Sequence, residues 1–580
     1  MKRPDTLRWL WQVTGRKKIY VAVLIVLQAV TGGSGVLYAL LLRDIVDHAV
    51  QGDSAGFGRA AILTVLLVAA QILLRTLIRY LEELSRSSVE NALKSRLLHE
   101  ILTRDFAAVS AVHSGEWLNR LTNDCTVVAN HFTEILPGLA GMVVRLISAA
   151  VMLIVLDTRF AAVMLPAGAV MLALTYFFRR RLKRLHKHVQ EQDGVLRIFL
   201  QERLGAQMLL RSYAAETVTQ SEAADKMSAH QAARMKKNRF SNLCNIGFIG
   251  CMNGMYLAGI CYCAYGILIH TISYGTLTAV TQLIAQIQTP FANITGYLPK
   301  YYAMTASAER LNDAERFAAD STESAKPLSE IRQAYDNMAE VGLRNVSYTY
   351  LPPSDTVCEL QKTDMPAVLR NLSFAVRKGE FVALTGQSGC GKSTVMKLLM
   401  CVYRPDEGVC YLKDRSGAET ETGAVWHRLF AYVPQGNQLM SGMIRQVVAF
   451  AEPEAAGDEI RLREALRTAC AEDFVDALEQ GADTVLGERG AGLSEGQMQR
   501  IAIARAVFSG SPVLMLDEAT SALDSDTERQ VLSNLRQMTD RTVLIVTHRP
   551  AALSFCDRVI RFSEAGMTEE TARKEQEHGV

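Results

Sequence analysis

Gly386-Gln-Ser-Gly-Cys-Gly-Lys-Ser-Thr394 follows an apolar run, Phe381-Val-Ala-Leu384, that has the composition of a buried strand. A glycine-rich turn after a strand, ending in Gly-Lys-Ser-Thr, predicts a P-loop. Its glycines allow successive backbone N–H groups to point at phosphate oxygens, and the dipole of the following helix adds positive potential. The alternative is a turn that binds no nucleotide, and the Gly-Lys-Ser-Thr ending argues against it.

The side chains of this loop have distinct expected roles. Lys392 reaches the β- and γ-phosphates, Ser393 supplies a hydroxyl to Mg²⁺, and Thr394 caps the new helix while contacting phosphate. Cys390 lies among the loop amides at a helix N-terminus, where a thiol becomes reactive, and an inert covered thiol is the alternative. The residues expected to contact ATP here are Gly386, Ser388, Gly389, Cys390, Gly391, Lys392, Ser393 and Thr394.

Two acids and a histidine follow apolar strands further along the chain. The run that begins at Ser511 ends in Asp517 and Glu518, which are placed to hold Mg²⁺ through water and to polarise the attacking water, respectively. After another apolar run, His548 can reach the γ-phosphate or the water. A lone histidine after a strand is more often structural, but the P-loop and the acid pair favour a catalytic role here.

A second anion site is predicted where Gly490-Ala-Gly-Leu-Ser-Glu-Gly-Gln497 opens a helix. Ser494, Gly496 and the helix N-terminus can bind phosphate there. One chain needs one phosphate cradle per nucleotide, so the second site makes sense if it closes over the ATP held by another subunit.

Length and charge limit the remaining possibilities. A chain of 580 residues is too long for one core, so two or more domains are expected. A net charge of +2 argues against a nucleic-acid partner, which normally requires a concentrated basic face. The eleven cysteines lack paired Cys-x-x-Cys spacing, which argues against zinc, and reduced thiols are expected.

The first half of the chain predicts a membrane domain. Its first apolar run, Ile19 to Leu42, is too long for a signal-peptide core and follows a cluster of Lys and Arg, so the N-terminus should be cytoplasmic. The block from Phe240 to Pro299 contains no charged residue and is long enough for two spans, which makes six in total. The other spans are expected at Ala60 to Tyr80, Ile135 to Leu156 and Phe160 to Phe178.

Long amphipathic helical patterns separate spans two and three, and spans four and five. Each predicts a hairpin whose legs extend about 35 Å into the cytosol at the helical rise; ordinary solvated loops are the alternative. Their tips are expected near Asp105 to Ser114 and near Leu210 to Glu216, where Arg211 to Glu216 is predicted to form a short docking helix.

A polar stretch at 319–339, broken by Pro327, has the composition of a linker. Strand patterns begin at Val341, and the alternating run to Tyr350 ends in an aromatic residue upstream of the P-loop. Tyr350 is expected to stack on adenine, with a strand-edge or core tyrosine as the alternative.

Together these motifs resemble those of a half-transporter of the ATP-binding-cassette (ABC) superfamily with the six-span exporter fold, over nearly the whole chain. The matches are the signature Leu493-Ser-Glu-Gly-Gln497, the loop before it (Gly487-Glu-Arg-Gly490), the Q-loop Tyr432-Val-Pro-Gln435, the D-loop Ser521-Ala-Leu-Asp524 and the switch histidine His548. The resemblance implies that Gln497 contacts nucleotide and that Gln435 contributes to catalysis and Mg²⁺ binding. It also implies that Gln435 and the docking helices pass ATPase closure to the membrane domain.

Three features depart from the family pattern. Glu495 occupies a position that is most often glycine, and it either faces the partner's γ-phosphate or turns to solvent. The chain between Tyr350 and Val368 is longer than usual, which weakens the adenine assignment. The tail after Phe562 is short and charged, and we expect it to lack the last strands of these ATPase domains.

The resemblance implies two domains of different fold class. An all-α six-helix transmembrane domain (1–318) is joined by the linker at 319–339 to an α/β P-loop ATPase domain (340–580). We expect an ATP hydrolase that uses ATP and Mg²⁺ to export an amphipathic small molecule, lipid or peptide by alternating access. The alternatives are an exporter-fold importer of a metal–siderophore complex and, nearly excluded by the spans, a soluble ABC ATPase. The expected location is the plasma or inner membrane, with the ATPase domain cytoplasmic. A homodimer is favoured over a heterodimer, because no catalytic motif is degenerate.

The sequence also predicts a substrate path. Arg145 lies midway in a span, where a charge facing lipid costs at least about 2.5 to 3.5 kcal/mol, so it should face the bundle interior. The sixth span carries a polar stripe at helical spacing, close to Pro290, which can bend the helix. We expect Arg145 and this stripe to line the cavity and to bind an anionic or polar headgroup, or else merely to hold helices together. The stripe comprises Gln282, Gln286, Thr289 and Asn293.

Overall fold

The computed structural model describes residues 4–320, 325–352, 365–387, 389–436, 438–487, 490–563 and 566–571. It divides into two compact units. The first contains Met1–Lys94 and Thr122–Glu309, and the second contains Ser95–Leu121 and Arg310–Val580. Each unit has its own packing.

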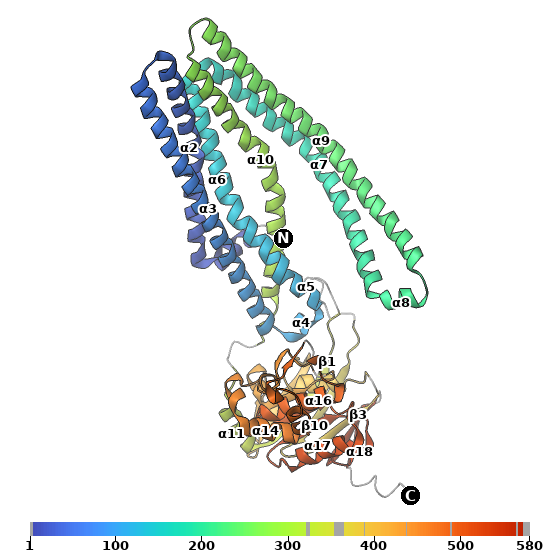
Figure 1. Cartoon of the computed structure of the whole chain (residues 1–580). Coiled ribbons are helices and arrows are strands. Elements are labelled where there is room, and N and C mark those ends of the chain that lie inside the picture. Colours follow the sequence, from blue (N-terminus) through green and yellow to red (C-terminus); the bar gives the residue numbers. More distant parts are fainter. Residues whose placement is uncertain are drawn as a thin grey trace. The chain divides into compact units, whose positions relative to one another are not determined.

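The first unit is built from long helices, which confirms the predicted all-α class (Figure 1). After the short α1 (Pro4–Val13), the long helices are α2 (Lys18–Gln51), α3 (Ser54–Thr103), α6 (Cys125–Leu156), α7 (Thr158–Gly205), α9 (Glu216–Leu268) and α10 (Tyr274–Asp313). Within the described residues, four helical segments are long and apolar enough to cross a membrane: Gly15–Gln51, Ser54–Thr103, Ser114–Leu156 and Glu216–Leu268. The expected fourth and sixth spans lie in α7 and α10.

α2 and α6 pack closely because small residues lie between them. A Cβ atom on Gly32 of α2 would lie 2.5 Å from the backbone oxygen of Gly141 on α6. Ala39 and Ala149 are fully buried in the same unit, together with Leu153 and Leu283. Small residues let helix backbones approach, and this contact supplies van der Waals stabilisation where lipid offers no hydrophobic drive.

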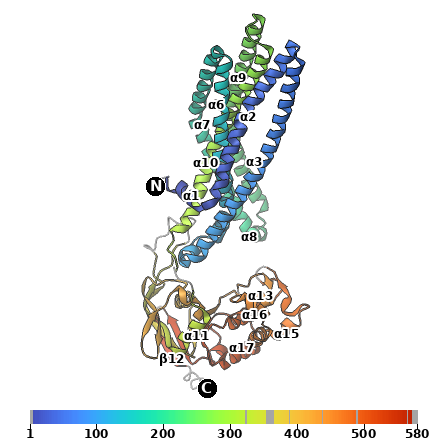
Figure 2. The same cartoon turned by 90° about the vertical axis from the view of Figure 1, so that its left-hand side faces the viewer.

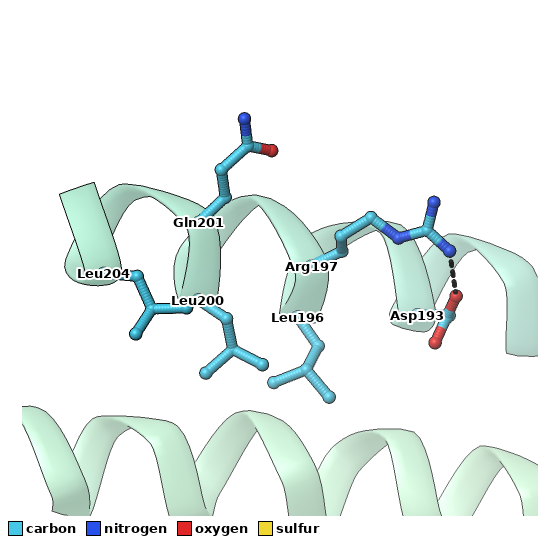
Figure 3. Close-up of a pocket in the computed structure, with 6 residues that line it drawn as sticks. All are labelled: Asp193, Leu196, Arg197, Leu200, Gln201 and Leu204. Atoms are coloured by element: carbon cyan, nitrogen blue, oxygen red, sulfur yellow. Dashed lines mark hydrogen bonds and ion pairs between the residues drawn. The ribbon is translucent and has the colours of Figure 1, made fainter. Parts of the chain in front are cut away.

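α7 and α9 run side by side as an antiparallel hairpin that ends in α8 (Gln207–Ser212) (Figure 1). The short helix at this tip was predicted at Arg211 to Glu216, but it begins four residues earlier, and Glu216 already opens α9. A groove of 470 Å³ lies along α7, where Leu196, Leu200 and Leu204 point toward the neighbouring helix (Figure 3). Their spacing of four residues gives α7 the apolar stripe of a helical pair.

The second unit contains the predicted α/β ATPase fold. Its six-stranded sheet has the order β12-β11-β3-β10-β9-β6, and the five strands from β11 to β6 are parallel. The strands are β3 (Phe381–Gly386), β6 (Phe430–Val433), β9 (Val513–Asp517), β10 (Thr542–Val546), β11 (Arg558–Ser563) and β12 (Gly566–Thr571). The carboxyl ends of these parallel strands meet at one edge, which is the usual place for a nucleotide site.

A second, antiparallel sheet has the order β2-β1-β4-β5, and β7 (Gly442–Met443) pairs with β8 (Val485–Leu486). The strands of the antiparallel sheet are β1 (Met338–Tyr348), β2 (Leu369–Arg377), β4 (Glu407–Asp414) and β5 (Glu419–Glu421). Figure 2 shows α13, α15 and α16 on the side of the unit away from β12. The helices of this unit are α4 (Phe106–Ala111), α5 (Ser114–Asn119), α11 (Leu328–Asn337), α12 (Lys392–Leu399), α13 (Ile444–Val448), α14 (Glu459–Thr468), α15 (Glu472–Asp476), α16 (Glu495–Phe508), α17 (Ser525–Gln537) and α18 (Pro550–Leu553).

Two segments of the second unit differ from expectation. The tail does contain a further strand, because β12 pairs antiparallel with β11 from Gly566 to Thr571. Its polar composition, Gly-Met-Thr-Glu-Glu-Thr, suits the exposed edge of a sheet and therefore gives no hydrophobic signal. The second half of the polar stretch at 319–339 forms α11, whose Ile331 and Tyr335 are buried in the ATPase core.

Candidate nucleotide-binding site

The P-loop connects β3 to α12, as predicted. Gly386, Gly389 and Gly391 have φ angles of 137°, 85° and 97°, which only glycine adopts without strain. Lys392 lies folded back along the loop, where its Nζ donates hydrogen bonds to the backbone oxygens of Gly386 (2.7 Å) and Gln387 (2.9 Å). Lys392, the side chain expected to bind phosphate, thus already donates to oxygens of its own loop, and a nucleotide must replace these contacts. Ser388, also expected to contact ATP, lies outside the described residues.

The two acids lie where β9 ends. The carboxylate of Asp517 is buried, with 3% of the residue exposed, and it accepts a hydrogen bond from the Tyr432 hydroxyl at 3.0 Å. Glu518 has a φ of 51° and accepts a hydrogen bond from Gln435 Nε2 at 2.8 Å. The structure therefore brings together Gln435 and Glu518, two of the three predicted catalytic residues. The third, His548, is exposed in the loop after β10.

The oxygen-bearing side chains at this edge fit a magnesium ion. Ser393 is the second residue of α12, which follows the P-loop, and Asp517 offers a carboxylate that is already oriented by one hydrogen bond. Hydroxyl, carboxylate and amide oxygens are the hard ligands that Mg²⁺ takes alongside phosphate and water. Gln435 completes the predicted ligand set, although in this structure its amide N–H₂ group contacts Glu518.

Tyr350 lies beside the P-loop, but its ring is already engaged. Its hydroxyl is 2.8 Å from Thr394 Oγ1, and its ring meets those of Tyr348 and Tyr403 edge-on, at centroid distances of 5.2 and 5.7 Å. Tyr403 also stacks on Tyr348 at 5.1 Å and contacts the ring of Phe106 on α4 at 5.9 Å. The expected adenine platform is therefore one member of an aromatic cluster inside the second unit.

The predicted second anion site lies at the start of α16. Ser494 caps the helix with a capping box, in which the Ser494 N–H donates to Gln497 Oε1 (2.9 Å) and the Gln497 N–H donates to Ser494 Oγ (3.3 Å). Glu495 follows and is exposed. A Cβ atom at Gly496 would lie 3.0 Å from the backbone oxygen of Ala522, so glycine permits close approach of the D-loop.

The D-loop is held by side chains that sequence analysis did not single out. Gln499 of α16, 2% exposed, donates to Ser521 Oγ (3.0 Å) and accepts from the Ala522 N–H (2.9 Å). Arg549 donates to the backbone oxygens of Ser521 and Leu523, at 2.6 and 2.8 Å.

Arg549 is in turn held by Glu528, which is 1% exposed. Glu528 accepts a hydrogen bond from Arg549 (3.1 Å) and another from the Thr520 hydroxyl (2.7 Å). Buried polar residues within apolar helix patterns, such as Gln499 and Glu528, are the signal that could have identified this group.

The predicted substrate path involves α6 and α10, which both contact α2. A Cβ atom on Gly35 would lie 2.5 Å from Gln286 Nε2, and one on Gly32 would lie 3.2 Å from the backbone nitrogen of Arg145. Since Gly32 and Gly35 are about 5 Å apart along a helix, Arg145 and Gln286 lie at neighbouring depths. Gln282 and Thr289 are also partly buried, whereas Asn293 is exposed.

Comparisons with known proteins match both units. The family model described as ABC transporter transmembrane region matches residues 21–291, and that described as ABC transporter matches residues 369–521. The ATP-dependent lipid A-core flippase of Pasteurella multocida (strain Pm70) is 26% identical over 578 residues, which is 98% of this chain and 95% of the relative. The leukotoxin export ATP-binding protein LtxB of Aggregatibacter actinomycetemcomitans is 26% identical over 96% of this chain and 76% of its own length. A solved bacterial Atm1-family ABC exporter with ATP bound superposes with a TM-score of 0.77, at 21% identity, covering 97% of each chain.

We predict that Cys390 is alkylated rapidly and that ATP prevents the reaction. Cys390 is partly exposed, and its sulfur lies 3.8 Å from Lys392 Nζ, in the loop whose amides phosphate would cover. Alkylation should block nucleotide turnover, as measured by phosphate release after mass spectrometry has confirmed the adduct. Cys390→Ser is the control that should resist the reagent. Full turnover of the alkylated protein would show that Cys390 lies outside the phosphate cradle.

Proposed function

The chain belongs to the ABC transporter family, as a membrane protein whose transmembrane region is fused to an ATPase domain, and we propose that it exports an amphipathic lipid or peptide. ATP hydrolysis coupled to transport follows from membership of the family. Similarity over 98% of the chain to a protein named as a lipid A-core flippase supports a lipid substrate. Arg145 and Gln286, which lie at neighbouring depths against one face of α2, support the proposal because they offer a cation and an amide to a polar headgroup.

In the proposed hydrolysis step, ATP lies on the P-loop and displaces the internal contacts of Lys392. Ser393, Asp517 and Gln435 would hold Mg²⁺, which supplies charge neutralisation at the phosphates. Glu518 orients and deprotonates the attacking water, so it must exchange its contact with Gln435 for that water. His548 contacts the γ-phosphate or the water, and Tyr350 contacts adenine after its ring is released from the aromatic cluster.

A homodimer is the proposed assembly. Ser494, Gly496 and Gln497 stand at an exposed helix N-terminus, which supports a role in closing over the ATP of a second subunit. The proposed organisation keeps 1–318 as the transmembrane domain, 319–339 as the linker and 340–580 as the ATPase domain.

The proposed location is the plasma or inner membrane. The Lys and Arg cluster before α2 supports a cytoplasmic N-terminus and ATPase domain.

Substrate uptake into inverted vesicles, compared with right-side-out vesicles, tests export against import of a metal–siderophore complex.

Glu518→Gln should abolish ATP turnover and leave ATP binding intact. The substitution removes the base but retains the length of the side chain and every phosphate contact, so a closed dimer should accumulate. Phosphate release and binding of a fluorescent ATP analogue measure the two properties. Turnover at the wild-type rate would remove Glu518 from the catalytic role.

The homodimer hypothesis predicts that purified protein hydrolyses ATP without any other chain. Co-expression of two differently tagged copies, one carrying Glu518→Gln, should yield mixed dimers with turnover well below half of the wild-type rate, because both sites must close together. If turnover instead required a second, co-purifying half-transporter, the assembly would be a heterodimer.

Arg145→Ala should remove substrate-stimulated ATPase activity and spare basal turnover. The lost cation lies beside α2 in the proposed path, far along the chain from the catalytic residues. Lipids with anionic headgroups, added to the protein in nanodiscs, are the appropriate ligands. Arg159→Ala, which removes an exposed cation at the start of α7, is the matched control. Stimulation by these lipids at an unchanged half-saturating concentration would contradict the proposed path.

A further inference from the structure

Tyr432 contacts the proposed metal-holding acid from a neighbouring strand. β6 and β9 are parallel, and Tyr432 is paired in register with Met515, two residues before Asp517. The long tyrosine side chain spans this offset and places its hydroxyl 3.0 Å from Asp517 Oδ2. Among the described residues, Tyr432 is the only side chain that donates a hydrogen bond to Asp517.

This contact matters because Asp517 is buried. A carboxylate removed from water needs a donor, and a donor on one oxygen also fixes the direction of the other. A tyrosine hydroxyl carries its proton at neutral pH, so Tyr432 is the donor of this hydrogen bond. The ring packs against the aromatic core that contains Tyr348 and Tyr403, which limits its movement.

The same short segment also holds the second acid. Gln435, three residues after Tyr432, donates to Glu518, the residue that follows Asp517. The end of β6 and the residues just after it therefore contact both acids at the end of β9, one through the partly buried hydroxyl of Tyr432 and the other through the exposed amide of Gln435. Because Tyr432 lies within β6 and Gln435 follows the strand, the Q-loop can move Gln435 away from Glu518 without moving Tyr432.

We propose that Tyr432 is a positioning residue for magnesium, which orients the Asp517 carboxylate by holding one of its oxygens. The inference rests on the proposed role of Asp517 in holding the metal. It assigns to Tyr432 a function separate from that of Gln435 at the other end of the same motif: Tyr432 orients the metal-holding Asp517, and Gln435 contacts Glu518.

The test is Tyr432→Phe in the full-length protein, which removes the hydroxyl and keeps the ring. Mn²⁺ replaces Mg²⁺ as the probe, and its binding is measured by electron paramagnetic resonance with a non-hydrolysable ATP analogue at saturation. We expect the Kd for Mn²⁺ to rise about tenfold, as is usual when a partner of a metal ligand is lost. Affinity for the nucleotide without metal should change less than twofold.

Tyr335→Phe is the matched control. It removes a hydrogen-bonded tyrosine hydroxyl elsewhere in the same unit, that of the buried Tyr335, which lies 2.9 Å from Thr542 Oγ1. Thermal unfolding of both variants is recorded, so that a general loss of stability is separated from a change at the metal.

Each outcome of these measurements either supports or overturns a role proposed above. A rise in the Kd for Mn²⁺ confined to Tyr432→Phe supports the proposal. An unchanged Kd, or an equal rise in Tyr335→Phe, overturns it. Asp517→Ala separates the role of Asp517 from that of Tyr432. If this variant binds Mn²⁺ as the wild type does, the proposed role of Asp517 is wrong. If Asp517→Ala loses Mn²⁺ binding but Tyr432→Phe does not, only the proposed role of Tyr432 is wrong.

Discussion

The parallel pairing of β9 with β6 and β10 is the constraint on which the nucleotide site depends. It places the carboxyl end of β9 beside the ends of two neighbouring strands, so Asp517 and Glu518 leave the sheet next to the Q-loop and the loop of His548. The fully apolar interior of β9 makes its register costly to change, because a slip by one residue would bury an acid on the wrong face. The positions of the acids therefore follow from the packing of the sheet.

The polar groups at this edge have partners before any nucleotide arrives. Lys392 donates to P-loop carbonyls, Gln435 to Glu518 and Tyr432 to Asp517. Each buried charge thereby avoids the cost of an unpaired group in a low-dielectric site. In the proposed hydrolysis step, ATP and the attacking water replace the contacts of Lys392 and of Glu518, whereas the contact of Tyr432 with Asp517 is kept. In that proposal, the release of Gln435 from Glu518 would link the arrival of the nucleotide to movement of the Q-loop.

The P-loop, the acid pair and the six long helices could be predicted from the sequence because their signals are local: glycine spacing, an apolar run before an acid, and hydropathy. Tyr432 and Arg549 could not, because their roles depend on which strands and loops become neighbours. β12 was missed because an exposed edge strand needs no apolar pattern. The start of the short helix at the α7–α9 tip was predicted four residues too late, since no side-chain cap marks its boundary.

The backbone of Glu518 has a further consequence. A glutamate at a φ of 51° stores about 1 to 3 kcal/mol of conformational strain, which the hydrogen bond from its own N–H to the Val546 oxygen helps to offset. Glycine would relieve that strain, so folding stability and the proposed catalytic role of Glu518 are opposed at this position. The chain keeps the strained residue at this position. Random mutagenesis selected only for thermal resistance would therefore be expected to favour glycine at position 518, with loss of ATP turnover.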